Sequence, residues 1–246
     1  MSLVEEYRRQ FMWRDWTGAL SRCPAHPGQR ILDLGCGVGD VSQFLASHGL
    51  EVTGVDGNPE LLAAARERYP ACRFERQDLR ELKSAMGRFD ALWCSFTAAY
   101  LIDLEATFAQ WSALLKPRAW VCMIEADDLL GHEPLSAASR RRIEEFYEDA
   151  SLGRRYEFKS ANSLRRALSH AGFQVAESVL PDRELAFNGP ASPEVLEAWQ
   201  MRLERMAGLK RFLGESFERF KVEFLACLTA GDHRSTCRVM CCVGSR

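Results

Sequence analysis

The sequence has no long hydrophobic run and almost no net charge. No stretch approaches the ~18 apolar residues that a membrane-spanning helix needs, and 32 Lys and Arg residues nearly balance 34 Asp and Glu residues. This balance argues against a protein that coats nucleic acid or anionic lipid. The N-terminus, Met1 to Glu6, opens into charged residues, which is not typical of a signal peptide. We therefore expect a cytoplasmic protein with no nucleic-acid and no membrane partner.

Metal-binding spacings are also lacking. The chain has nine cysteines but no C-x-x-C pair, and its five histidines form no cluster beside them. Structural zinc sites need such spacings, so no metal site is expected. Most cysteines lie in apolar runs and are predicted to be reduced, buried thiols. The alternative that three thiols converge to form a soft-metal site stays open.

The first half of the chain alternates short apolar segments with amphipathic ones. Residues 30–34, 51–55, 72–75, 89–94 and 120–125 are typical of strands, and helices are expected between them, one beginning at Asn58 and Pro59. Asp103 is expected to cap a helix that continues through Leu115 and ends at Lys116–Pro117. Apolar strands separated by helices predict a parallel sheet covered on both faces.

The second half is more helical. Helices are expected over residues 163–171, 194–213 and 215–228, with strands at 173–176 and 237–243. Residues 126–160 are charged and aromatic and give few strand signals. Because the last two strands are far apart in sequence, the helical stretch between them is predicted to be an insertion.

A glycine-rich turn carries the clearest chemical signal. Gly35, Gly37 and Gly39 follow the first strand and precede a helix, where glycines let the backbone approach a ligand closely. Asp56 ends the second strand, 23 residues after Asp33. An acidic residue at about this offset binds the ribose diol in mononucleotide-binding folds.

The same turn argues against phosphate-bearing ligands. The dinucleotide fingerprint requires a third glycine where this chain has Asp40, and a carboxylate there would repel a pyrophosphate. No Gly-Lys-Ser/Thr follows, so the P-loop pattern fails as well. An oxidoreductase using a dinucleotide is therefore disfavoured, and a nucleoside without phosphates is expected.

These segments resemble the class I S-adenosylmethionine-dependent methyltransferases of the small-molecule type. The resemblance covers about residues 28–126 and resumes at the last two strands. It is carried by the glycine motif 31–39, Val55-Asp56, Gln77-Asp78-Leu79, residues 89–92 and residues 114–117. It implies an α/β, Rossmann-like, doubly wound, mostly parallel sheet of seven strands in the order 3-2-1-4-5-7-6. Strand 7 would be antiparallel, with a helical insertion before it, and the cofactor would be S-adenosyl-L-methionine.

The resemblance also implies roles in cofactor binding. Gly35 and Gly37 would line the methionine part, and Asp33 would hold the glycine turn and the cofactor's amino group. Asp56 would accept hydrogen bonds from the ribose hydroxyls.

Further residues would border the adenine and the methionine chain. Gly57, Asn58, Asp78 and Leu79 are implied at the adenine, while Cys94 and Ser95 would lie under the methionine chain. The exit of the fourth strand has no Asn-Pro-Pro-Tyr/Phe, the signature of enzymes that methylate base or amide nitrogens, so base flipping is disfavoured.

One domain, residues 1–246, is predicted. It would comprise an N-terminal helical cap (1–28), a cofactor-binding core (29–126), and an acceptor-side lid or insertion (127–160 and 181–232). Tyr7, Trp13 and Trp16 are candidates for an N-terminal helix that closes over the cofactor or packs on the surface. The insertion could instead form a homodimer interface.

The acceptor is expected to be a small molecule methylated on oxygen or nitrogen by in-line displacement. Such a reaction depends largely on positioning, and needs a general base only where the acceptor is protonated. The catalytic residues stay unknown; His132 and Tyr100 are candidates, with Glu125, Asp127 and His233 also on the acceptor side. The alternative function is that of a catalytically inactive S-adenosylmethionine-binding regulatory or scaffold protein.

Overall fold

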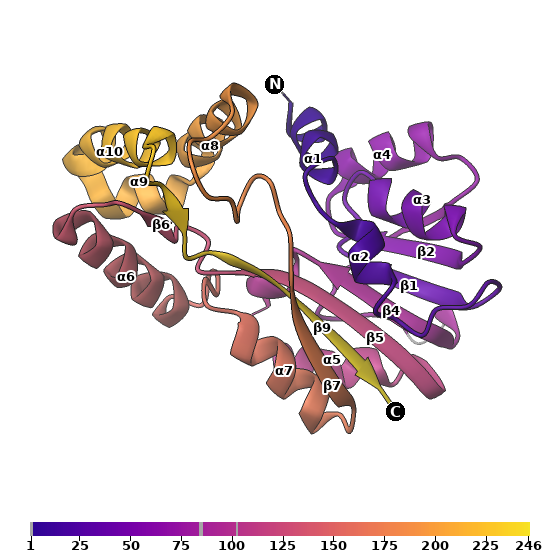
Figure 1. The fold of residues 1–246 in the computed structure, drawn as a ribbon. Coiled ribbons are helices and arrows are strands. Elements are labelled where there is room, and N and C mark those ends of the chain that lie inside the picture. The colour runs from indigo at the N-terminus through magenta and orange to yellow at the C-terminus, as the bar shows by residue number, and fades with distance from the viewer. Residues whose placement is uncertain (1, 84–85, 102) are drawn as a thin grey trace.

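The computed structural model describes residues 2–83, 86–101 and 103–246 (Figure 1). Its centre is a seven-stranded sheet in the order β3-β2-β1-β4-β5-β9-β7. The strands are β1 (Arg30–Leu34), β2 (Glu51–Asp56), β3 (Arg73–Arg76), β4 (Phe89–Ser95), β5 (Leu115–Asp127), β7 (Gln174–Leu180) and β9 (Arg238–Ser245). All pairs from β3 to β5 are parallel, and β9 runs antiparallel to both β5 and β7. The expected strand order is confirmed.

Successive residues of the central strands point to opposite faces, and helices cover both. Ile31 and Trp93 are buried in a cluster with α2 (Trp16–Leu20) and α3 (Asp40–Ser47). Their neighbours Leu32 and Leu92 are buried on the other face, with α5 (Leu104–Ser112) and α7 (Ala161–His170). A sheet that is apolar on both faces needs this double cover, which explains the continuous apolar strands.

Two further helices lie on the side of the sheet that carries β1 to β3 (Figure 1). The chain begins with α1 (Leu3–Phe11), and α4 (Pro59–Arg68) follows β2. Asn58 caps α4 as expected, because its side chain accepts hydrogen bonds from the Glu60 and Leu61 N–H groups. A short 3-10 turn, Ala98–Tyr100, follows β4.

The insertion forms helices α8 (Pro193–Arg205), α9 (Ala207–Leu213) and α10 (Phe217–Thr229), which gather with α6 (Ala137–Leu152) beyond one end of the sheet (Figure 1). A two-stranded sheet of β6 (His132–Glu133) and β8 (Arg234–Ser235) ties the segment after β5 to the segment before β9. The buried faces of these helices, including Trp199 and Phe224, belong to the same apolar cluster as Ile31 and Trp93. The insertion is therefore part of the core of this chain.

Two sequence predictions differ from the structure. The helix after Asp103 ends at Ser112, because Leu115 already pairs with Phe89 as the first residue of β5. The helix predicted over 194–213 is two helices broken at Met206, whose backbone ψ of 68° is not helical. The stretch 126–160, which gave few strand signals, contains the long helix α6.

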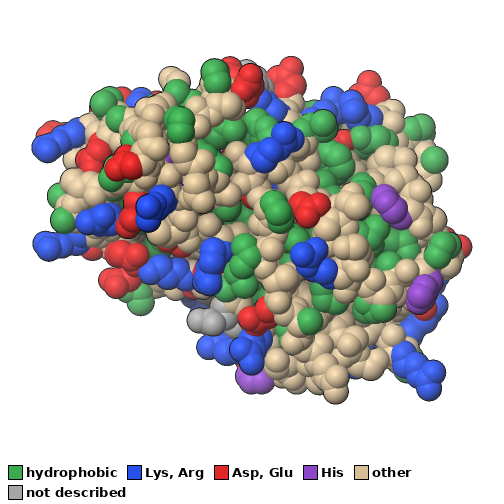
Figure 2. Space-filling model, viewed as in Figure 1, with side chains coloured by type: hydrophobic (Ala, Val, Ile, Leu, Met, Phe, Trp, Pro, Cys, Tyr) green, Lys and Arg blue, Asp and Glu red, His purple; other side chains and the backbone are tan. Residues whose placement is uncertain are grey.

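Among the described residues, no helix is both long and apolar enough to cross a membrane. Acidic and basic side chains are interspersed over the face seen in Figure 2, and both signs crowd the region of the insertion helices. All nine cysteines are free thiols, and most are buried.

Candidate functional site

The glycine turn is held in a conformation that favours glycine. Gly35, Gly37 and Gly39 have φ values of +76°, +52° and +81°, in the left-handed region that side chains disfavour. A Cβ atom on Gly35 would lie 2.0 Å from Oγ1 of Thr97, so no side chain fits there. The Gly35 N–H donates to the Val55 carbonyl at 2.8 Å, which fixes the turn against the end of β2.

Asp56 joins the glycine turn to the start of α4. Its Oδ2 accepts a hydrogen bond from the Gly37 N–H at 3.0 Å, and its Oδ1 accepts one from the Asn58 N–H at 2.7 Å. Each carboxylate oxygen can accept more than one hydrogen bond. The carboxylate therefore keeps acceptor capacity for a pair of hydroxyl groups.

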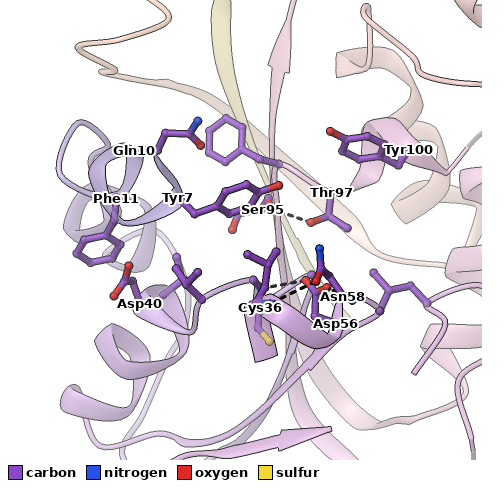
Figure 3. A pocket seen from close by; sticks show the side chains of 18 of the residues that line it. Tyr7, Gln10, Phe11, Cys36, Asp40, Asp56, Asn58, Ser95, Thr97 and Tyr100 are labelled. Carbon is purple, nitrogen blue, oxygen red and sulfur yellow. Dashed lines mark hydrogen bonds between the residues drawn. The ribbon is translucent and has the colours of Figure 1, made fainter. Parts of the chain in front are cut away.

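A cavity of about 720 Å³ opens above the turn. Figure 3 shows Tyr7 and Gln10 of α1 on one side and Tyr100 on the other, with Asp56 and Asn58 below them in this view. The structure brings most of the predicted cofactor residues to its wall: Gly35, Gly37, Asp56, Gly57, Asn58, Asp78, Leu79 and Ser95.

Two predicted residues lie beneath the cavity and do not line it. Asp33 is buried, and its Oδ2 accepts a hydrogen bond from Ser42 Oγ at 2.5 Å. Burial raises the pKa of Asp33 to about 7. Cys94 is fully buried in the sheet, and burial also raises the pKa of its thiol. Asp33 therefore lies under the glycine turn, and Cys94 packs within β4.

Asp78 reaches the cavity wall but already has a partner. Its two carboxylate oxygens accept hydrogen bonds from the Arg80 guanidinium at 2.9 and 2.6 Å. These bonds lower the pKa of Asp78 to about 2. The side chain is 46% exposed, so the pair sits at the rim of the cavity.

Of the two candidates for catalysis, only one reaches the cavity in the structure. Tyr100 lines the cavity, whereas His132 is not part of its wall. The His132 ring is 2% exposed and packs on Trp199 and Phe224, with its Nδ1 atom 3.0 Å from His233 Nε2. Burial, together with His233, lowers the pKa of His132 to about 3. The histidine pair thus packs against the insertion helices, away from the cavity.

The N-terminal segment contributes more of the wall than the sequence indicated. Tyr7, Gln10 and Phe11 of α1 line the cavity together with Arg14 and Trp16. Of the three aromatic residues predicted here, Trp13 lies between the two helices, under the Arg9 guanidinium. The i, i+3 spacing of Trp13 and Trp16 does not mark one helix, because the chain turns between them.

A second cavity of about 480 Å³ adjoins the first. The two share Tyr7, Gln10, Arg14, Phe96 and Tyr100, so the N-terminal segment and the residues after β4 border both cavities. The other walls of the second cavity come from the end of β5, from α6 and the segment after it, and from the insertion.

Buried ion pairs brace the second cavity. Arg14 lies 3.4 Å from Asp182 and 3.3 Å from Glu184, and Arg202 also pairs with Glu184. Glu125, at the end of β5, lines the same cavity and is 1% exposed. No local motif identified Arg14 or Arg202, because their partners are remote in sequence.

Comparisons with known proteins agree with this architecture. The model of the methyltransferase domain family matches residues 31–118. The malonyl-[acyl-carrier protein] O-methyltransferase of Enterobacter lignolyticus is 30% identical over 98 residues, which are 40% of this chain and 39% of that protein. An O-methyltransferase of Pyrenophora dematioidea is 26% identical over 167 residues, covering 65% of this chain and 60% of that protein. The chain thus spans less than two thirds of the length of either relative.

The fold comparison extends over the whole chain. A Haemonchus contortus phosphoethanolamine N-methyltransferase 2, solved with S-adenosyl-L-methionine, superposes with a TM-score of 0.61 at 20% identity. The alignment covers 99% of this chain and 56% of that one. At this identity the likeness concerns the fold. Residues 31–118 thus match a methyltransferase domain, and the fold of the chain is similar to that of an S-adenosylmethionine-dependent methyltransferase.

Proposed function

We propose that the chain transfers the methyl group of S-adenosyl-L-methionine to an oxygen or nitrogen atom of a small-molecule acceptor. The observation that carries this proposal is the pair of adjoining cavities that share Phe96 and Tyr100. One is built around the glycine turn and Asp56, and the other lies under the insertion. Two cavities that meet at shared residues can hold two reactants next to each other, which is what a direct transfer requires.

The residues of the first cavity fit the proposed cofactor. Gly35 and Gly37 leave open the space over the turn, and Asp56 offers carboxylate oxygens at the end of β2. In this proposal Gly57, Asn58, Asp78 and Leu79 border the adenine, while Ser95 lies along the methionine chain. Asp33 and Cys94 act from below, through Ser42 and the packing of β4.

When bound, the cofactor supplies an electrophilic methyl group on a sulfonium. The chain positions it and keeps water away. Tyr7 and Gln10 of α1 cover the glycine turn, and Phe96 and Tyr100 border both the nucleoside side and the acceptor side. Excluding water matters because a hydrated nucleophile reacts more slowly and hydrolysis competes.

Residues 127–160 and the insertion 181–232 form the acceptor-side lid in this proposal. Leu185, Arg202, Met206 and Leu209 of the insertion line the second cavity beside the ends of β4 and β5. That position supports a lid that shapes the acceptor pocket. The homodimer and the cytoplasmic location expected from the sequence stay predictions.

Calorimetry with S-adenosyl-L-methionine, S-adenosylhomocysteine and NAD tests the first half of the proposal. Micromolar binding of the first two and none of NAD is the expected result. A small-molecule library assayed for release of S-adenosylhomocysteine tests the second half. Tight cofactor binding without turnover on any compound would favour the inactive regulatory protein instead.

A further inference from the structure

Glu125 is a buried carboxylate that faces the acceptor cavity. It lies near the end of β5, directly after the apolar run 119–124, and is 1% exposed. Its Oε2 accepts a hydrogen bond from the Ala99 N–H at 3.2 Å, and its Oε1 accepts one from the Ala126 N–H at 3.1 Å. Backbone donors thus fix both oxygens, and the remaining lone pairs are available to a ligand.

Of the five arginines that line the same cavity, Arg14, Arg155, Arg202 and Arg205 are paired with acidic residues. Arg14 and Arg202 contact Glu184, and Arg205 contacts Glu6. Within the described part of the chain, Glu125 takes part in no salt bridge. A buried carboxylate without an ion-pair partner is costly, and such groups concentrate at functional sites.

The titratable groups around Glu125 come from several elements. Arg14 faces it from the segment after α1, Tyr100 from the 3-10 turn, and Tyr156 from the segment after α6. Cys94 lies beneath it in β4. Burial raises the pKa of Glu125 to about 7, against the opposing effect of the backbone N–H groups and Arg14. The carboxyl therefore exchanges its proton near neutral pH.

The sheet register places Glu125 next to the cofactor cavity. Ser95 of β4 pairs with Ile124 of β5, and the Phe96 N–H donates to the Ile124 carbonyl at 2.8 Å. Glu125 is therefore one residue beyond the point where β4 leaves the sheet. Ser95, Phe96 and Thr97 line the first cavity, so this carboxylate stands at the boundary between the two.

Aromatic rings form the walls around this carboxylate. Tyr100 packs edge-on against Tyr156 with ring centroids 4.8 Å apart, and Tyr156 lies 4.5 Å from the Phe158 ring. The Arg14 guanidinium covers the Phe96 ring at 4.2 Å. Aromatic walls beside a buried hydrogen-bond acceptor suit a planar ring that carries a hydroxyl group.

Building on the proposed methyl transfer, we propose that Glu125 is the general base for a phenolic acceptor. The acceptor's O–H bond breaks, and its proton goes to a carboxylate oxygen of Glu125. The oxygen's electron pair forms the new O–C bond with the methyl group of the sulfonium. The S–C bond breaks, and its electron pair stays on sulfur as a thioether. The proton then leaves Glu125 for water.

The test compares Glu125→Gln with Glu223→Gln in the full chain. Glu223 is a matched control: it accepts hydrogen bonds from Ser136 N–H and Ser139 Oγ, both at 2.7 Å, and lines neither cavity. The assays are S-adenosylhomocysteine affinity by calorimetry, melting temperature, and methylation of catechol, vanillin and 4-hydroxybenzoate. Because Glu125→Gln loses one backbone hydrogen bond, Glu125→Asp is included as the variant that keeps the carboxylate.

We expect wild type and Glu223→Gln to methylate at least one phenol, with kcat/KM falling below about pH 7. Glu125→Gln should lower kcat roughly 100- to 10,000-fold, the usual contribution of a general base. It should also abolish the fall in kcat/KM at low pH, the acid limb of the profile, and leave the S-adenosylhomocysteine Kd within threefold. Glu125→Asp should retain the acid limb at reduced kcat.

Infrared titration of protein labelled with ¹³C-glutamate gives a readout that does not depend on activity. A carboxyl that titrates near neutral pH should be present in wild type and Glu223→Gln and absent from Glu125→Gln. The proposal is overturned if Glu125→Gln keeps the wild-type rate or acid limb, or if that titration persists in it. It also fails if a wild type that binds S-adenosylmethionine methylates no phenol. No binding of S-adenosylmethionine would overturn the proposed function as well.

Discussion

Replacing Asp56 by alanine tests the nucleoside site most directly. The carboxylate already accepts hydrogen bonds from Gly37 N–H and Asn58 N–H, at 3.0 and 2.7 Å, and the proposed ribose hydroxyls would add two more. A hydrogen bond to a charged group contributes about 1.5–3 kcal/mol. Losing a single ribose contact therefore weakens binding about 10- to 150-fold, since about 1.4 kcal/mol corresponds to a factor of ten.

The assay is calorimetric titration with S-adenosylhomocysteine, with circular dichroism to check the fold. Asp56→Asn is the companion variant, because it keeps one carbonyl oxygen as an acceptor and removes the charge. We expect the affinity to fall in the order wild type, Asp56→Asn, Asp56→Ala. A folded Asp56→Ala protein that binds within threefold of wild type would refute the placement of the ribose at the end of β2.

Three further predictions address the glycine turn, the ion pairs and the lid. Gly35→Val or Gly37→Val should abolish S-adenosylhomocysteine binding by calorimetry, since added Cβ atoms would lie 2.0 Å from the Thr97 side chain and 3.2 Å from the Tyr7 ring; normal titration by either folded variant contradicts this. Burial raises the pKa of Glu184, but Arg202 and Arg14 outweigh burial and hold this pKa below its ordinary value of 4.5. The ionised Glu184 carboxylate therefore stabilises the fold above pH 4.5, and this stabilisation is lost as the pH falls through the pKa of the folded state. Glu184→Gln should therefore lower the free energy of unfolding in urea at pH 7 by about 3 kcal/mol or more, with a smaller difference in acid, whereas Glu197→Gln at the exposed pair with Arg9 should cost less than about 1 kcal/mol. Met206→Gln in the acceptor cavity should change the KM for a phenol. It should leave the S-adenosylhomocysteine Kd within about threefold, a difference below ~0.7 kcal/mol. Val222 is 66% exposed and lines neither cavity, so Val222→Gln is the control that should change neither quantity.

Local sequence was enough for features that local chemistry decides. The left-handed turn at Gly35, Gly37 and Gly39 needs glycine at each position, and the Asn58-Pro59 pair is a helix start that depends only on neighbouring N–H groups. Asp56 could be placed at the end of β2 because strand and turn together fix its position. The order of the sheet followed from the family resemblance carried by these same motifs.

The errors concern features that distant contacts decide. Leu115 has the spacing of a helical residue, but pairing with Phe89 draws it into β5. His132 was a candidate for catalysis, whereas packing on Trp199 and Phe224 buries it away from both cavities. The second cavity joins residues from Arg14 to Arg202, so no window of the sequence contains it.

The place of β9 in the sheet has a consequence for how the chain reaches this fold. In the described structure β7 pairs with β9 alone, and β9 bridges it to β5. Asp127 and its partner Arg238 are 111 positions apart. Contacts of such long range form late, because the intervening chain must first be brought together. Until they form, β5 presents an unpaired edge of apolar residues, which is a surface prone to association between chains. Refolding at high protein concentration should therefore lose protein to aggregation while the β5 edge is unpaired. This period ends when residues 238–245 pair with β5.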